Sequence, residues 1–193
     1  MIGGIVLAAG LSERMTGPVP KQLLPLGDEP MVKISVRNAE ASSLDQVVVV
    51  TGYRATEVGA VVAGARSIVV ENPEYREGNM TSFRTGFDAL PDCGAYVVLL
   101  ADMPGVTSEM IDRVVETWNE QEPWAGVSSY REGRAHPLLL SADAMAQAVQ
   151  MDGVKGVWRF LNDAPPGQVV DITFDLAMPP DINTRADYDG LNL

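Results

Sequence analysis

Short apolar runs rich in β-branched residues alternate along the chain with stretches in which apolar residues recur every three or four positions. The runs have the length and composition of β-strands, and they cover residues 4–9, 46–52, 66–72, 95–102, 124–130 and 168–173. The stretches between them have the spacing of amphipathic helices, and they cover residues 30–42, 54–63, 80–90, 107–120, 141–150 and 154–162. This alternation predicts an α/β fold built from strand–helix units.

Residues 47–50 and 97–100 are apolar at every position, which is typical of strands that are covered on both faces. We therefore predict a three-layer α/β/α sandwich around a mostly parallel sheet. The segment 128–140 contains a polar turn centred on Glu132 and Gly133 between two strand-like runs, so it predicts a β-hairpin added late in the sheet. The 193 residues of the chain suit one domain, and we expect a single domain over residues 1–193.

The overall charge narrows the range of partners. The formal net charge is -12, and long-range repulsion would oppose binding to nucleic acid or to an anionic membrane surface. Cys93 is the only cysteine, so no intramolecular disulfide can form. No apolar run approaches the ~20 residues of a membrane span. We expect a cytoplasmic protein with neither a nucleic-acid nor a membrane partner.

The first predicted strand leads into a loop that contains Gly10, Arg14 and Lys21. The loop lacks the GxGxxG pattern of dinucleotide-binding proteins, and it is not a P-loop, because Gly17 is followed by Pro18. Backbone amides around Gly10 can face phosphate oxygens, with the two cations supplying the compensating charge. The alternative is a solvated surface turn with two ordinary cations.

Two acidic residues follow stiff or apolar segments at different points of the chain. Asp102 ends the apolar run 95–102, and Asp181 follows two prolines near the C-terminus. Each carboxylate could simply accept hydrogen bonds from its own loop. In an open α/β sheet, however, the loops after the strands gather at one edge. If the two carboxylates converge there, they form an oxygen site of the kind that Mg²⁺ prefers, with nucleotide phosphates completing its shell.

Six segments occur in an order that carries a family resemblance: "LAAGLSERM", "KQLLPLGDEPMV", "NPEYREGNMTSFRTGF", "LLADMPGVTSEMID", "AHPLLL" and "DINTRADYD". They resemble the successive motifs of the MobA-like NTP-transferase family and span about residues 4–189. Ala9 in "LAAG" resembles the molybdenum cofactor cytidylyltransferase branch. The resemblance implies a Rossmann-like sandwich that transfers a nucleoside monophosphate, CMP from CTP, to a phosphorylated acceptor such as molybdopterin, with release of pyrophosphate.

Residue by residue, the resemblance also implies roles. The implied nucleotide-binding residues are Leu7, Ala8, Ala9, Gly10, Arg14, Lys21, Asn79 and Ser82. Among these, Arg14 and Lys21 would bind the phosphates and would be catalytic together with Asp102, whereas Asn79 and Ser82 would contact the base or the ribose. Asp102 and Asp181 would hold Mg²⁺.

The acceptor side is less well defined by the sequence. His136 in "AHP" matches the position where the family binds its acceptor, although a structural role is the alternative for a sole histidine. Many cytidylyltransferases carry "GDxGxR" on this side, whereas this chain has "MDGVKGVWRFL" with Asp152, and Ala135 replaces the usual glycine. Trp118, Trp124 and Trp158 are assigned to the core.

The rival functions are a transferase that uses GTP or a sugar or metabolite phosphate, and a non-catalytic protein that binds and delivers a nucleotide or cofactor. A molybdoenzyme or its chaperone would be the protein partner.

Overall fold

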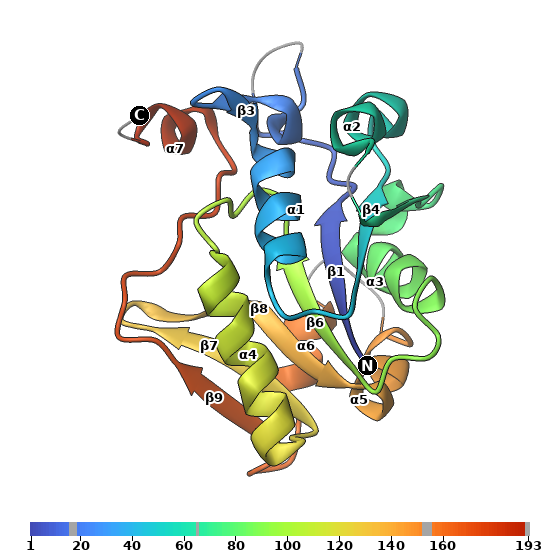
Figure 1. Cartoon of the computed structure of the whole chain (residues 1–193), viewed down its shortest axis with the longest axis vertical. Helices are drawn as coiled ribbons and strands as arrows, with labels where there is room; N and C mark the ends of the chain where they lie inside the picture. The colour runs from blue at the N-terminus through green and yellow to red at the C-terminus, as the bar shows by residue number, and fades with distance from the viewer. Residues whose placement is uncertain (16–18, 65, 152–155, 192–193) are drawn as a thin grey trace.

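A computed structural model describes residues 1–15, 19–64, 66–151 and 156–191, which form helices on both faces of a central sheet (Figure 1). The sheet has seven strands in the order β5-β4-β1-β6-β8-β7-β9. In chain order, these strands are β1 (Ile2–Ala8), β4 (Gln46–Thr51), β5 (Ile68–Glu71), β6 (Ala95–Leu100), β7 (Ala125–Tyr130), β8 (Gly133–Ser141) and β9 (Val169–Thr173). A separate two-stranded sheet pairs β2 (Pro25–Leu26) with β3 (Glu29–Pro30). The predicted α/β fold with a mostly parallel sheet is confirmed.

The helices cover the sheet as two layers. One layer consists of α1 (Met31–Ala41), α2 (Ala55–Val62) and α4 (Ser108–Gln121), and the other of α3 (Asn79–Asp88), α5 (Ala142–Ala148) and α6 (Gly156–Asn162). Side chains along β1 alternate between them: Val6 and Ala8 pack toward the first layer, and Ile5 packs toward the second. The remaining elements are α7 (Arg185–Asp189) and two short 3-10 helices, η1 (Lys21–Leu23) and η2 (Tyr75–Glu77).

Two strands begin two residues away from their predicted starts, each for a local reason. β1 begins two residues earlier, because Ile2 and Gly3 pair with the start of β6. Gly3 looks unlike a strand residue, but a Cβ at this position would lie 2.8 Å from Leu90 Cδ1 and 2.9 Å from Cys93 Sγ, so the close packing favours glycine. β5 begins two residues later than predicted, because the Ser67 N–H donates to the Glu40 carboxylate at 2.7 Å instead of extending the sheet.

The predicted late hairpin is present, and its second strand lies inside the sheet. β8 pairs antiparallel with both β6 and β7, and β7 in turn pairs parallel with β9. Because β8 runs against its neighbours, its first residues lie at the edge where β6 ends. His136, in the first half of β8, is thereby brought close to Asp102, which follows β6. Among the described residues, no helix is long and apolar enough to cross a membrane.

Candidate active site

A cavity of about 390 Å³ lies at the edge of the sheet where β1 and β6 end. One part of its wall is polar and charged, and it is formed by Gly10, Arg14, Lys21, Gln22, Asn79, Ser82, Asp102, His136, Asp181 and Asn183. The other part is apolar or aromatic, and it is formed by Leu7, Ala9, Tyr75, Phe83, Leu100, Ala101, Val157 and Trp158. The cavity therefore suits a ligand that carries both a charged group and an apolar or planar group.

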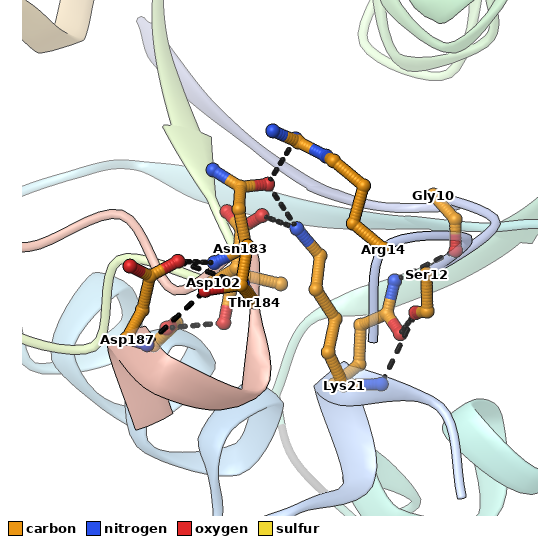
Figure 2. A network of polar contacts seen from close by, with 11 residues as sticks. Gly10, Ser12, Arg14, Lys21, Asp102, Asn183, Thr184 and Asp187 are labelled. Atoms are coloured by element: carbon orange, nitrogen blue, oxygen red, sulfur yellow. Dashed lines mark hydrogen bonds and ion pairs between the residues drawn. The ribbon is translucent and has the colours of Figure 1, made fainter. Parts of the chain in front are cut away.

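Lys21 is the centre of the charged cluster. Its ammonium group forms an ion pair with Asp102 and donates a hydrogen bond to Asn183 Oδ1 at 2.9 Å, as Figure 2 shows. Asn183 Oδ1 also accepts a hydrogen bond from the Arg14 guanidinium at 2.7 Å. Lys21 is only 8% exposed, whereas Arg14 is exposed. The two cations of the opening loop therefore converge on one oxygen atom from a distant part of the chain.

The loop after β1 is held in shape by the buried amide of Gln22, which is only 2% exposed. Its Nε2 donates to the Gly10 carbonyl at 3.0 Å, and its Oε1 accepts from the Ser12 hydroxyl at 3.1 Å. The Ser12 hydroxyl in turn accepts from the Lys21 N–H at 3.1 Å. This chain of bonds links both ends of the loop and fixes the start of η1, from which the Lys21 side chain projects (Figure 2).

The two predicted acidic residues lie near each other. The Ile182 N–H donates to the Asp102 carbonyl at 2.9 Å, which ties the C-terminal segment to the loop after β6. Partial burial, followed by the negative charge of Asp102, raises the pKa of Asp181, although Asp181 lies at the exposed rim. Lys21 and Asn183 oppose this rise. Among the described residues, no three acidic, histidine or cysteine side chains are grouped so that they could hold a metal ion by themselves.

The segment around Asn183 is held by a helix cap. The Thr184 side chain accepts from the Asp187 N–H, and the Asp187 carboxylate accepts from the backbone N–H groups of Thr184 and Asn183, at 2.7 and 3.0 Å. This capping box fixes the first turn of α7 (Figure 2). It also explains why the Asn183 side chain faces the cavity in a defined orientation.

His136 lies deep in the wall and is 7% exposed. Its ring packs edge-on against Trp158, with centroids 5.7 Å apart, and its buried Nε2 has no hydrogen-bond partner among the described residues. Burial lowers the pKa of His136 to about 4, and the nearby Asp102 charge only partly opposes this effect. The imidazole is therefore neutral at pH 7, and its Nε2 is not used in a hydrogen bond with any described residue.

Of the remaining predicted nucleotide-binding residues, some line the cavity and one does not. Leu7 and Ala9 line the cavity, whereas Ala8 does not, since its side chain is buried on the opposite face of β1. Asn79 begins α3 and is exposed on the cavity wall. Ser82 also lines the cavity, but its hydroxyl accepts a hydrogen bond from Asn72 Nδ2 at 2.9 Å.

Several wall residues were missed by sequence reasoning. Asn183 stands two positions after Asp181 in the quoted "DINT" segment, and Gln22 follows Lys21, so their positions next to predicted residues were the only signal. Trp158 was assigned to the core. It does pack against a hydrophobic core cluster, but it also lines the cavity, so the assignment to the core alone is corrected. The sequence expectations for Gly17 and Asp152 lie outside the described residues.

Taken together, the cavity pairs two cations with two carboxylates beside a tightly held loop, a combination that suits a phosphate ester accompanied by a divalent cation. Comparison with known proteins agrees with that class of ligand. Residues 4–169 match the MobA-like NTP transferase domain, and the chain belongs to this family. Asp181 and Asn183 lie beyond the matched segment.

Among curated proteins, the chain is similar to the bifunctional protein GlmU of Chromobacterium violaceum, with 32% identity over 110 residues. That match covers 57% of this chain but 24% of the relative, so the chain spans about a quarter of the length of the relative.

Two solved structures resemble nearly the whole chain. Rv0371c from Mycobacterium tuberculosis has a TM-score of 0.87 and 29% identity, covering 97% of this chain and 95% of that one. Another structure of Rv0371c is a complex with manganese, with a TM-score of 0.82, 28% identity, and 97% and 96% of the two chains covered. A nucleotidyl transferase from Methanothermobacter thermautotrophicus, Mth528, has a TM-score of 0.80 and 25% identity over 97% of this chain and 94% of that one.

Proposed function

We propose that the protein is a nucleotidyltransferase that transfers CMP from CTP to a phosphorylated acceptor, molybdopterin, and releases pyrophosphate. The observation that carries this proposal is the convergence of Lys21, Arg14, Asp102 and Asp181 in one cavity beside the loop that contains Gly10. These four side chains come from three separate parts of the chain. A surface turn with ordinary cations would not bring them together.

The predicted nucleotide-binding residues that line the cavity have proposed tasks. Lys21 and Arg14 bind the phosphates of the triphosphate, and backbone N–H groups of the loop around Gly10 add neutral hydrogen bonds. Asn79 and Ser82 belong to α3 and line the cavity, where a base or ribose would contact them. The acceptor phosphate is already an anion, so no protein nucleophile is required. The chain contributes alignment of the two substrates and neutralisation of charge.

A divalent cation fits the donor set of the cavity. Asp102 and Asp181 offer carboxylate oxygens, and phosphate oxygens of the nucleotide would supply the ligands that the protein lacks. The raised pKa of Asp181 beside Asp102 is consistent with two carboxylates whose repulsion a cation would relieve. The manganese complex of Rv0371c supports a divalent ion, and we propose Mg²⁺. Bound there, it would neutralise negative charge on the phosphates.

The choice of CTP rests on Ala9 and on the resemblance of "LAAG" to the cytidylyltransferase branch. The choice of molybdopterin rests on the same branch and on His136, which lines the cavity and whose buried Nε2 has no hydrogen-bond partner among the described residues. The proposal further includes one domain over residues 1–193, a cytoplasmic location, and a molybdoenzyme or its chaperone as the recipient of the product.

The proposal can be tested by measuring pyrophosphate release. CTP and GTP are each supplied with Mg²⁺ and with molybdopterin, a sugar phosphate or no acceptor. The expected result is release that requires CTP and molybdopterin together. Release with GTP or with the sugar phosphate instead would favour the rival transferases. Triphosphate binding, seen as a rise in melting temperature, without release under any condition would favour a binding and delivery protein.

A further inference from the structure

Lys21 and Asp102 are assigned to different ligands in the proposed function, yet in the structure they bind each other. The Lys21 ammonium pairs with the Asp102 carboxylate, and both side chains are largely buried, with 10% and 15% exposed. A second donor of the ammonium is used by Asn183 Oδ1 at 2.9 Å. The cation that would bind phosphate is thus held by an oxygen that would bind the metal.

We propose that Lys21 and a divalent cation compete for Asp102, so that the metal binds poorly alone and binds well only together with a triphosphate. This inference rests on the proposed function, because it assigns Lys21 to phosphate and Asp102 to the metal. It adds a role that neither assignment contains: Lys21 couples the two binding events. It also makes Lys21 an inhibitor of metal binding while no triphosphate is present.

The physical reason is that neither ligand can enter the charged cluster alone without leaving a charge unpaired. A divalent cation on Asp102 would displace Lys21 and would then lie beside a largely buried positive charge, which repels it strongly. A triphosphate alone would draw Lys21 away and would then face the carboxylates of Asp102 and Asp181 without compensation. When both ligands bind, each cation has an anion, and all the charges are paired.

The triphosphate therefore pairs with Lys21, and this leaves the Asp102 carboxylate free to bind the metal. By thermodynamic linkage, the factor by which the triphosphate raises metal affinity equals the factor by which the metal raises triphosphate affinity. Direct contact between phosphate and metal also couples their binding in any such site. The contribution of Lys21 can be separated from that contact, because Lys21 acts on the metal even when no nucleotide is present.

Arg14 provides a matched comparison within the same cluster. It is also a cation assigned to phosphate, and its guanidinium donates to the same Asn183 Oδ1 at 2.7 Å. Its hydrogen bonds among the described residues do not include Asp102, and its side chain is exposed. Removing Arg14 should weaken triphosphate binding without freeing a metal ligand. Removing the Lys21 side chain should weaken triphosphate binding and should also free the Asp102 carboxylate as a metal ligand.

The test is a titration of the intact protein with Mn²⁺ alone, followed by the electron paramagnetic resonance signal of the free ion. The proteins compared are the parent, Lys21→Met, Arg14→Met and the double variant Lys21→Met/Asp102→Asn. Lys21→Met is expected to bind Mn²⁺ roughly tenfold more tightly than the parent, within the usual range of coupling. Arg14→Met should stay within about threefold of the parent, since its charge is exposed and screened. The double variant should lose the gain.

The proposal is overturned if Lys21→Met binds Mn²⁺ no more tightly than the parent, or if Arg14→Met gains as much. Lys21→Gln, which removes the charge but keeps a polar end, serves in place of Lys21→Met should that variant fail to fold. Because no nucleotide or acceptor is present, this result is independent of the transfer reaction. A gain in Mn²⁺ affinity in Lys21→Met, with no pyrophosphate release from any triphosphate, would support the competition and reject the proposed activity. Pyrophosphate release without a gain in Mn²⁺ affinity would support the proposed activity and reject the competition.

Discussion

The side-chain oxygen of Asn183 accepts a hydrogen bond from the ammonium group of Lys21 at 2.9 Å, although the two residues lie 162 positions apart in the chain. The contact joins the loop after β1 to the segment that precedes α7, and both segments border the cavity (Figure 2). A ligand in the cavity would therefore contact the loop after β1 and the segment before α7 at the same time.

Lys21→Ala should weaken triphosphate binding roughly tenfold or more, because a hydrogen bond to a charged group contributes about 1.5–3 kcal/mol. Isothermal calorimetry with CTP measures the change directly. Lys33→Ala is the matched control, since Lys33 is on α1 with its side chain 51% exposed and pairs with Glu29 outside the cavity. Unchanged CTP affinity in Lys21→Ala would contradict the assignment of Lys21 to phosphate.

Ala9→Gly should shift the base preference from CTP toward GTP. Ala9 lines the cavity, and its methyl group also packs against the backbone of Gly52, where an added Cβ would lie 2.8 Å away. Removing the methyl widens the space beside the loop, and a change of this size discriminates by about 1–3 kcal/mol. Pyrophosphate release at equal CTP and GTP concentrations gives the ratio. A parent protein that prefers GTP would disprove the assignment of CTP.

Gln22→Met should raise the KM for the triphosphate more than it lowers kcat. The variant keeps the volume of the side chain but removes the bonds to the Gly10 carbonyl and the Ser12 hydroxyl, so the loop loses its fixed shape. The loss of these two hydrogen bonds should also lower the free energy of unfolding by about 1–3 kcal/mol, since a typical hydrogen bond contributes about 0.5–1.5 kcal/mol. Gln147→Met, which removes an exposed bond to Asp143, is the control. Equal effects of the two substitutions would show that Gln22 does not hold the loop.

The order and type of the main elements were predictable from the sequence, because apolar periodicity directly reflects burial. Residues 47–50 are apolar because β4 is covered on both faces, and the helices were found because each has one buried side. The position of β8 between β6 and β7 was not predictable, since strand order depends on pairing between distant segments. The short α7 was missed because it has no buried residue to create a pattern.

The place of a residue in the cavity was predictable where its residue type occurs in a recognisable motif, as Lys21 and Asp102 do. The ion pair between Lys21 and Asp102 was not predictable, because the sequence does not show which opposite charges meet when they lie 81 positions apart. Gln22 and Asn183 were missed for a related reason. An amide side chain carries no charge that indicates a role in the sequence. What it does depends on the hydrogen-bond partners that the fold places beside it.

Asp102→Asn and Asp181→Asn should each reduce turnover roughly 100-fold or more, about 3 kcal/mol of transition-state stabilisation, with a smaller effect on CTP affinity. The two variants should differ in stability. Asp102→Asn leaves the buried Lys21 without its counter-ion and should melt at a lower temperature, whereas Asp181 is at the exposed rim and its variant should melt near the parent.

Asp28 is exposed in the turn between β2 and β3, and Asp28→Asn is the control for Asp102→Asn and Asp181→Asn. Steady-state kinetics and thermal melting are measured on the same preparations. Near-normal turnover in either acidic variant would remove that residue from the proposed metal site.

His136 should make the protein less stable as the pH falls from 6.5 toward 4. Burial lowers its pKa from 6.5 to about 4, so in this interval the unfolded chain binds a proton that the folded protein does not. The free energy of unfolding therefore decreases with falling pH, by up to about 3 kcal/mol from this residue. Asp181 acts in the opposite direction near its own pKa, because a raised carboxyl pKa makes the folded protein bind the extra proton.

The comparison that isolates His136 is the parent against His136→Gln, whose side chain does not titrate. Urea unfolding at several pH values between 7.5 and 4 gives the free energy of unfolding of each protein. The contribution of Asp181 is present in both proteins and largely cancels in the difference. The parent should lose stability relative to His136→Gln as the pH falls through this interval, and the difference should be constant above about pH 7. Parallel curves over the whole range would mean that the His136 imidazole is not held neutral by burial in the cavity wall.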